Sequence, residues 1–181
     1  MNKMMTKNNG QEEIEWLVID KNDVSIQLLS LYILDYKKYN GMDIDVTWTG
    51  CSLRTWLNGT FIKTAFNSDE QKLIRETLVS DDKNPLRKTS AAIQYTHDKV
   101  FLLSINEVYS LFDQDGDRTC EATTFAKNQV KNYSTAWWLR TPGSKSNHAT
   151  CVRASGSINY NVTLTSPSGV RTHFMDGFSG I

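Results

Sequence analysis

Apolar residues occur in short segments whose period changes along this chain, and no other sequence feature constrains the fold as strongly. Residues 14–19 and 24–29 alternate apolar with other residues around a turn at 20–23, a pattern typical of a β-hairpin. From Leu53 onward apolar residues recur at helical spacing, although Asn58-Gly59 weakens this helix. Strands followed by short helices and then by a polar, turn-rich segment predict one α+β domain.

Two further helices have N-terminal capping signals. Ser68 and Gln71 have the spacing of a capping box ahead of an apolar stripe. Ser104 and Glu107 repeat this spacing, and they predict a short helix that continues to about Phe112.

The segments around these helices are assigned from their polarity. Residues 79–97 are polar, contain Pro85 and predict a loop, whereas residues 100–103 predict a short buried strand. Residues 1–12 are polar and predict a disordered tail ahead of a single domain over residues 13–181. The tail lacks the apolar core of a signal peptide, so we expect a cytoplasmic protein unless a phage particle or a dedicated exporter carries it out.

The charge balance argues against two classes of partner. Twenty basic residues equal twenty acidic ones and no stretch is strongly basic, so no nucleic-acid ligand is expected. No apolar run approaches the ~18–20 residues that span a bilayer, so no membrane insertion is expected either. The sequence leaves the oligomeric state open.

Cysteines and acidic residues do not form a recognisable metal or cofactor site. Cys51, Cys120 and Cys151 are far apart and odd in number, which favours free thiols over a disulfide framework. Residues 113–117 read Asp-Gln-Asp-Gly-Asp, but their glycine is fourth and Thr124 is twelfth, where an EF-hand needs Gly sixth and Glu twelfth. We therefore expect a solvated turn here, and neither a metal nor a cofactor in the protein.

Four phrases in sequence order carry a family resemblance. They are Ile14-Glu15-Trp16, Leu53-Arg54-x-Trp56-Leu57-Asn58-x-x-Phe61, Asp98-Lys99-Val100-Phe101-Leu102-Leu103-Ser104-x-x-Glu107 and Trp137-Trp138-Leu139-Arg140-Thr141-Pro142-Gly143. Together they resemble a bacterial and prophage family of domains of unknown function, related to the formylglycine-generating-enzyme branch of the C-type lectin fold. The resemblance runs from about residue 13 to Arg171. It implies a C-type-lectin-like domain in which Trp137 and Trp138 lie in the core and Arg140 makes structural hydrogen bonds.

A narrower resemblance, in the C-terminal third, is to the variable proteins of diversity-generating retroelements. In those systems a reverse transcriptase randomises template adenines, and the copy replaces the 3′ end of the target gene. Such randomisation of an Asn codon cannot produce Lys, Glu, Gln, Met or Trp. These five types fill 35 of residues 1–146 and none of residues 147–168, although an ordinary polar loop region is the alternative explanation.

The resemblance implies a variable region over residues 144–168 that recognises a protein or other macromolecular ligand. Its small apolar residues, Ala149, Val152, Ile158 and Val162, are expected to hold the backbone to the core. The residues between them are expected to face outward: Ser144, Lys145, Asn147, His148, Cys151, Arg153, Ser155, Ser157, Asn159, Tyr160, Asn161, Thr163, Thr165, Ser166 and Ser168. Tyr160 and Arg153 are the strongest candidates for ligand contact, because Tyr and Arg are over-represented among interface hot spots.

The formylglycine-generating branch also raises an enzymatic alternative. Catalysis there depends on a reactive cysteine pair near the C-terminus, and only Cys151 lies in that region. Asp98, Ser104 and Glu107 lack the histidine or nucleophile motif of a hydrolase. We therefore expect no catalytic residues. The remaining interpretations are a ligand-binding protein diversified by a retroelement and an undiversified binding or oligomerisation domain of the same fold.

The last residues depart from the family's pattern. After Gly169-Val170-Arg171 the family continues with Pro and an apolar strand containing Trp, whereas this chain continues Thr172-His173-Phe174-Met175-Asp176. Dropping the first base of the Thr172 codon allows Val-Arg-Pro-Ile-Leu-Trp-Met, which indicates a frameshifted final strand. We expect the polar tail to pair weakly and to leave a neighbouring strand edge partly open.

Overall fold

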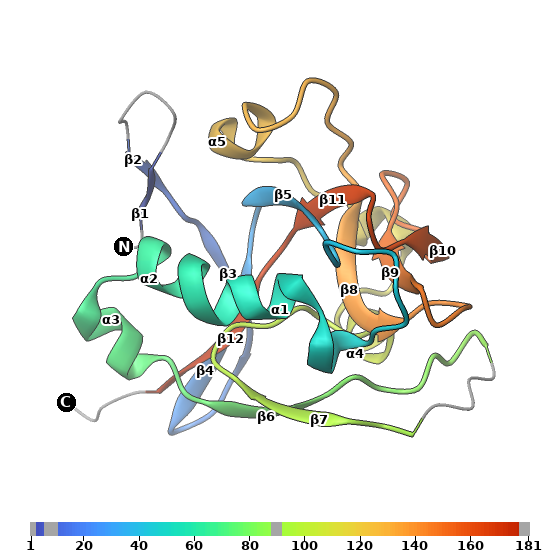
Figure 1. Ribbon diagram of the computed structural model, residues 1–181. Coiled ribbons are helices and arrows are strands. Elements are labelled where there is room, and N and C mark those ends of the chain that lie inside the picture. Colours follow the sequence, from blue (N-terminus) through green and yellow to red (C-terminus); the bar gives the residue numbers. More distant parts are fainter. Residues whose placement is uncertain (1–2, 6–10, 88–91, 178–181) are drawn as a thin grey trace.

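Short strands and short helices follow one another in blocks along the chain in a computed structural model, which describes residues 3–5, 11–87 and 92–177 (Figure 1). The strands are β1 (Lys3–Met5), β2 (Gln11–Glu13), β3 (Trp16–Lys21), β4 (Ser25–Ser30), β5 (Asp35–Lys38), β6 (Thr77–Ser80), β7 (Tyr95–Asp98), β8 (Trp137–Pro142), β9 (His148–Val152), β10 (Ile158–Thr163), β11 (Pro167–Val170) and β12 (His173–Gly177). The α-helices are α1 (Ser52–Trp56), α2 (Ile62–Ala65), α3 (Ser68–Leu73), α4 (Ile105–Leu111) and α5 (Thr124–Lys127). Shorter helical turns are η1 (Trp48–Gly50), η2 (Leu57–Phe61) and η3 (Asp115–Arg118). The predicted α+β class is confirmed.

Two sheets form the centre of the fold. One has five strands in the order β10-β9-β8-β11-β5, and the other has three in the order β12-β4-β3, which contains the predicted β3–β4 hairpin. β11 runs parallel to β8, with Gly169 opposite Trp137. A Cβ atom on Gly169 would lie 2.7 Å from the carbonyl oxygen of Ala136, so this close approach of two backbones requires glycine. In Figure 1 the five-stranded sheet lies on the right and α2 and α3 lie on the left.

β8 is buried on both of its faces, which explains its almost wholly apolar start. Trp138 packs into one hydrophobic cluster with Trp48 and Leu57, and Trp137 packs into a second cluster with Ile105. Both indole rings are fully buried, and each donates its N–H to a backbone carbonyl, at 2.8 Å for Trp138 and 3.1 Å for Trp137. The prediction that both tryptophans lie in the core is confirmed.

The helix expected from Leu53 forms, and its weak point has a structural role. α1 and α2 are joined by the π-helical turn η2, which contains Asn58-Gly59. The Asn58 side chain accepts hydrogen bonds from the backbone N–H groups of Lys99 and Val100, and it donates to the Val100 carbonyl at 2.9 Å. Asn58 therefore lowers the helix propensity of this segment, but its side chain fixes the backbone of Lys99 and Val100 to the helix.

Two helix starts were predicted, and one is wrong by a single residue. α4 begins with the predicted capping box of Ser104 and Glu107. α3 instead uses Asn67 as its N-cap with Glu70 three residues later, so the Ser68–Gln71 pairing is wrong. The Asn67 side chain accepts hydrogen bonds from two backbone N–H groups. Asn caps a helix as well as Ser does, so either residue could begin this helix.

The segment predicted as a loop over residues 79–97 has strand structure at both ends. β6 and β7 pair antiparallel over four positions, from Thr77 opposite Asp98 to Ser80 opposite Tyr95. Residues 100–103 are buried as predicted, yet they form no strand, and Phe101 alone makes a bridge, to His173. Thr96 and Asp98 are buried in this hairpin although both are polar, so hydrophobic alternation could not indicate the strand.

The two termini also differ from expectation. Within the predicted disordered tail, Lys3–Met5 and Gln11–Glu13 form a short antiparallel hairpin, and the rest of that tail lies outside the described residues. β12 pairs with β4 at five consecutive positions, from His173 opposite Leu29 to Gly177 opposite Ser25. The expectation of weak pairing is therefore wrong for residues 173–177, because backbone hydrogen bonds form whatever the side chains are.

Candidate functional site

Residues 144–168 form the outer part of the five-stranded sheet. β9 and β10 pair as a hairpin, with Ile158 opposite Val152 and Thr163 opposite His148, and a bulge interrupts the pairing between Asn159 and Val162. Ala149 and Val152 are buried as expected, and Ile158 and Val162 are half-buried. Leu164, which was not predicted as an anchor, is completely buried.

Most of the residues expected to face outward do so. The exposed ones are Lys145, Arg153, Ser155, Asn161, Thr163 and Ser166, and the half-buried ones are Ser144, Asn147, His148, Ser157, Asn159, Tyr160 and Thr165. We call these thirteen residues the outer face.

Two of the expected outward residues are buried. Cys151 is 4% exposed and lies in the core cluster around Trp138, because β9 lies between β8 and β10 with both of its faces covered. Burial raises the pKa of its thiol to about 11, so Cys151 stays protonated at neutral pH. Ser168 is also buried, and its hydroxyl donates to the carbonyl of Ala136 at 3.1 Å. The expectation that Cys151 and Ser168 face outward is therefore wrong.

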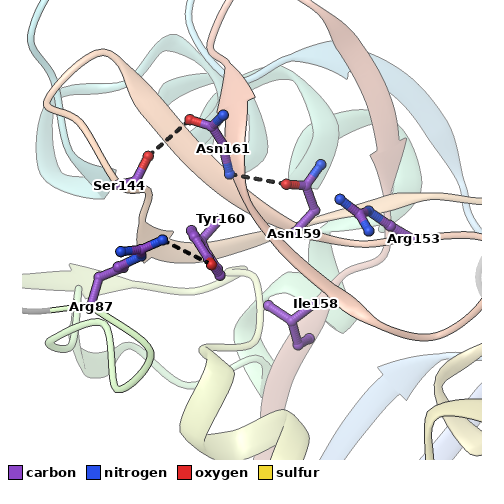
Figure 2. A pocket seen from close by; sticks show the side chains of 7 residues that line it. All are labelled: Arg87, Ser144, Arg153, Ile158, Asn159, Tyr160 and Asn161. Atoms are coloured by element: carbon purple, nitrogen blue, oxygen red, sulfur yellow. Dashed lines mark hydrogen bonds between the residues drawn. The ribbon is translucent and has the colours of Figure 1, made fainter.

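Part of the outer face lines a recess with a volume of about 530 Å³ (Figure 2). Tyr160 lies in its middle, and Arg87 reaches it from the segment after β6. The Arg87 guanidinium lies 5.0 Å from the centre of the Tyr160 ring and donates to the Tyr160 hydroxyl at 3.2 Å. Arg153 lies on the other side of Tyr160 in this view, and Asn159 lies between them.

Hydrogen bonds between neighbouring side chains and backbone hold the rim of this recess. The Ser144 hydroxyl donates to the Asn161 side chain at 2.9 Å, and its backbone N–H donates to the Tyr160 carbonyl at 2.7 Å. The backbone N–H of Asn161 donates to the side chain of Asn159 at 3.1 Å. Ser144 and residues 159–161 are therefore connected to each other before any ligand binds, as Arg87 is to Tyr160.

The turn that presents Arg153 depends on one glycine. Gly156 has a φ of +84°, and a Cβ atom there would lie 1.6 Å from the carbonyl oxygen of Asp115. Within the turn, the Arg153 N–H donates to the Ser157 carbonyl, and the Gly156 N–H donates to the Arg153 carbonyl, both at 2.8 Å. Glycine at position 156 is therefore needed for two reasons: the backbone is left-handed there, and it passes too close to the Asp115 carbonyl for a side chain to fit.

A second segment that sequence reasoning missed lies at the other end of the outer face. Asp43 and Asp45 accept hydrogen bonds from Asn147 and Ser146, at 3.1 and 2.6 Å. Between and before these aspartates, Met42 and Ile44 are 65% and 48% exposed. Two large apolar side chains within a short acidic segment were the available signal for this edge.

Groups that suggested catalysis or metal binding have structural roles. Asp98 accepts from Trp48, Arg54 and Thr96, whereas Ser104 and Glu107 cap α4. The predicted turn at 113–117 contains η3, where Asp115 pairs with Arg118 at 2.6 Å.

Arg140 makes the structural hydrogen bonds expected of it. It donates to the carbonyls of Ser80 and Leu102, and it pairs with both carboxylate oxygens of Glu107. Burial alone would raise the pKa of Glu107, but hydrogen bonds and charge from Arg140 outweigh it and lower that pKa.

The cysteines of this protein are free, and its described residues contain no cluster of metal ligands. All three cysteines are free, as predicted, and burial raises the pKa of Cys51 to about 12. Neutral buried thiols are poor nucleophiles. Among residues 3–5, 11–87 and 92–177, no three His, Cys, Asp or Glu side chains are grouped as a metal site would need, and no helix there could cross a membrane.

Comparison with known proteins identifies the family. A model of the family described as "Domain of unknown function (DUF6273)" matches residues 23–175, so the chain belongs to this family. No curated protein and no solved structure matches the chain.

Proposed function

We propose that this member of the DUF6273 family is a non-enzymatic binding protein whose outer face recognises a protein or other macromolecular ligand. The observation that carries the proposal is the separation of roles within residues 144–168. Apolar residues such as Ala149, Val152 and Leu164 are buried, while the thirteen polar or amphipathic residues of the outer face, between and on either side of them, reach the surface. A segment that served only to complete the sheet would not need this many polar side chains at the surface.

The composition of the outer face supports binding. It consists mainly of Ser, Asn and Thr around a single Tyr and a single Arg. Antibody-type binding loops have a similar composition, because Tyr gives large contact area at low entropic cost and Ser and Asn give adaptable hydrogen bonds. The rim hydrogen bonds around Tyr160 reduce the ordering cost of binding further.

Diversification by a retroelement, on a C-type-lectin-like scaffold, is the second part of the proposal. Residues that could change without loss of stability are those of the outer face, and residues that could not are the buried anchors. The absence of Lys, Glu, Gln, Met and Trp from residues 147–168 supports randomised Asn codons as their origin.

Sequencing the gene and its surroundings in related strains tests the proposal. We expect a reverse transcriptase gene and a near-copy of the codons for residues 140–171 that differs at adenines. Substitutions between strains should fall on outer-face codons and spare those of Ala149, Val152 and Leu164. Substitutions spread evenly over anchors and outer face would refute diversification, and they would favour an undiversified binding or oligomerisation domain.

A further inference from the structure

We propose that the Arg87–Tyr160–Arg153 recess receives a carboxylate side chain from an acidic segment of a protein partner. This inference rests on the proposed function, and it adds the chemistry of the group that is recognised. It also assigns a binding role to Arg87, which lies outside residues 144–168.

The charge of the recess is positive and uncompensated. Arg87 and Arg153 both line it and both are exposed, and no carboxylate is among its lining residues. The whole segment from Gly143 to Arg171 contains no Asp or Glu. Within the described residues neither arginine forms an ion pair, so both guanidinium groups are available to an incoming anion.

The geometry holds Arg87 in place for such a contact. Its guanidinium is stacked on the Tyr160 ring and hydrogen-bonded to the Tyr160 hydroxyl, which uses one of five N–H donors. The remaining donors keep the planar fork that suits a carboxylate. Because the side chain is already restrained, less rotamer entropy is lost when the anion binds.

The size and surroundings of the recess favour one carboxylate over a polyanion. A volume of about 530 Å³ accommodates a few side chains, and Asn159 and Asn161 beside the arginines can donate further hydrogen bonds. Nucleic-acid binding needs a row of basic groups along a phosphate backbone. The recess has only Arg87 and Arg153 as basic lining residues, and Asp43 and Asp45 contact the neighbouring residues Asn147 and Ser146, so no such row of basic groups continues there.

Panning a random peptide library, displayed on phage, against the immobilised full chain tests this inference. Selected peptides should share Asp or Glu at one position, and exchange of that residue for Asn or Gln should weaken binding about tenfold or more. The variant R87Q/R153Q should weaken the same peptides to a similar degree. R75Q/K131Q also removes two positive charges, from exposed side chains outside the recess, and it should have no effect. Melting temperatures of all variants should match that of the parent, because each replaced side chain is exposed.

A blocking variant separates the two possible failures. N161W places a large side chain on the rim and should abolish binding of any peptide that uses the outer face. If no selected peptide is sensitive to N161W, the proposed function fails together with this inference. If binding is lost in N161W but the selected peptides carry no shared Asp or Glu, the acidic partner is refuted and the proposed function stands. The same conclusion follows if R87Q/R153Q does not weaken binding. If a DNA oligonucleotide binds more tightly than the acidic peptides, and R87Q/R153Q abolishes that binding, the inference of an acidic protein partner is refuted in favour of nucleic acid.

Discussion

The buried imidazole of His173 should make the stability of this protein depend on pH between about 6.5 and 4. His173 is 3% exposed, its ring packs against Phe101 with the ring centres 4.6 Å apart, and neither ring nitrogen has a hydrogen-bond partner among the described residues. Burial lowers the pKa of His173 from 6.5 to about 4; the negative charge of Glu107 opposes this shift, and the positive charge of Arg140 adds to it. The folded protein therefore keeps this ring neutral in a range where the unfolded chain protonates it.

The sign and size of the effect follow from proton linkage. Below pH 6.5 the unfolded chain binds a proton that the folded protein does not, so the free energy of unfolding falls as the pH falls. The loss is complete near pH 4, where the folded protein binds the proton as well. A pKa lowered from 6.5 to about 4 corresponds to a loss of about 3 kcal/mol. Two unpaired buried nitrogens cost ~1–3 kcal/mol even at neutral pH.

Urea denaturation of the parent and of H173L at several pH values measures both contributions. H173L fills a similar volume without polar atoms, so it should be more stable than the parent at pH 7 by ~1–3 kcal/mol. The difference should grow by about 3 kcal/mol as the pH falls to 4. Glu107, whose lowered pKa weakens both proteins in acid, also interacts with the charge of His173, so subtracting the two curves removes only the part of its contribution that does not depend on His173. A difference that is constant between pH 7 and pH 4 would refute the reasoning.

Three further predictions concern the core, the buried ion pair and the outer face. Trp138→Ala should lower the free energy of unfolding by ~3–5 kcal/mol in urea denaturation, because a completely buried ring is removed. Glu107→Gln should cost ~1–3 kcal/mol, because Arg140 loses its bidentate partner while the Glu107 side chain is 35% exposed and Asp82 still lies 3.9 Å from Arg140, and Glu107→Asp should restore part of the loss. Ser155→Ala and Thr165→Ala should change stability by no more than about 0.5 kcal/mol, and a loss as large as that of Trp138→Ala would contradict their assignment to the outer face.

Features that depend on neighbouring residues could be predicted from the sequence. The β3–β4 hairpin and the capping box of α4 follow from patterns a few residues long, whereas the burial of Trp137 and Trp138 was expected from the family resemblance. Cys151 shows the limit of such patterns. Alternation along a strand predicts one outward face, but β9 has four consecutive buried residues because neighbouring segments cover both of its faces.

The candidate site was predictable only in part, since Arg87, Asp43 and Asp45 come from distant segments. Tyr160 and Arg153 were expected, whereas Arg87 contacts Tyr160 across 73 residues of sequence. Asp43 contacts Asn147 across 104 residues in the same way. A single sequence carries no signal for such pairs, because neither partner belongs to a local motif. The candidate site is therefore assembled by the packing of the outer face against the segments that contain Arg87 and Asp43, and its charge pattern depends on that packing.

The final strand joins a well-paired backbone to side chains that do not suit its position. Among the described residues, seven buried side-chain atoms lack a hydrogen-bond partner, and four of them belong to Thr172, His173 and Asp176. A reading frame that places Pro, Ile, Leu, Trp and Met over residues 172–176 would remove all four polar atoms from this part of the core. We expect a protein with this restored tail to melt at a higher temperature than H173L, because it removes two further unpaired groups. If the restored tail is no more stable than the parent while H173L is, the unpaired imidazole is a native feature and the frameshift account is wrong.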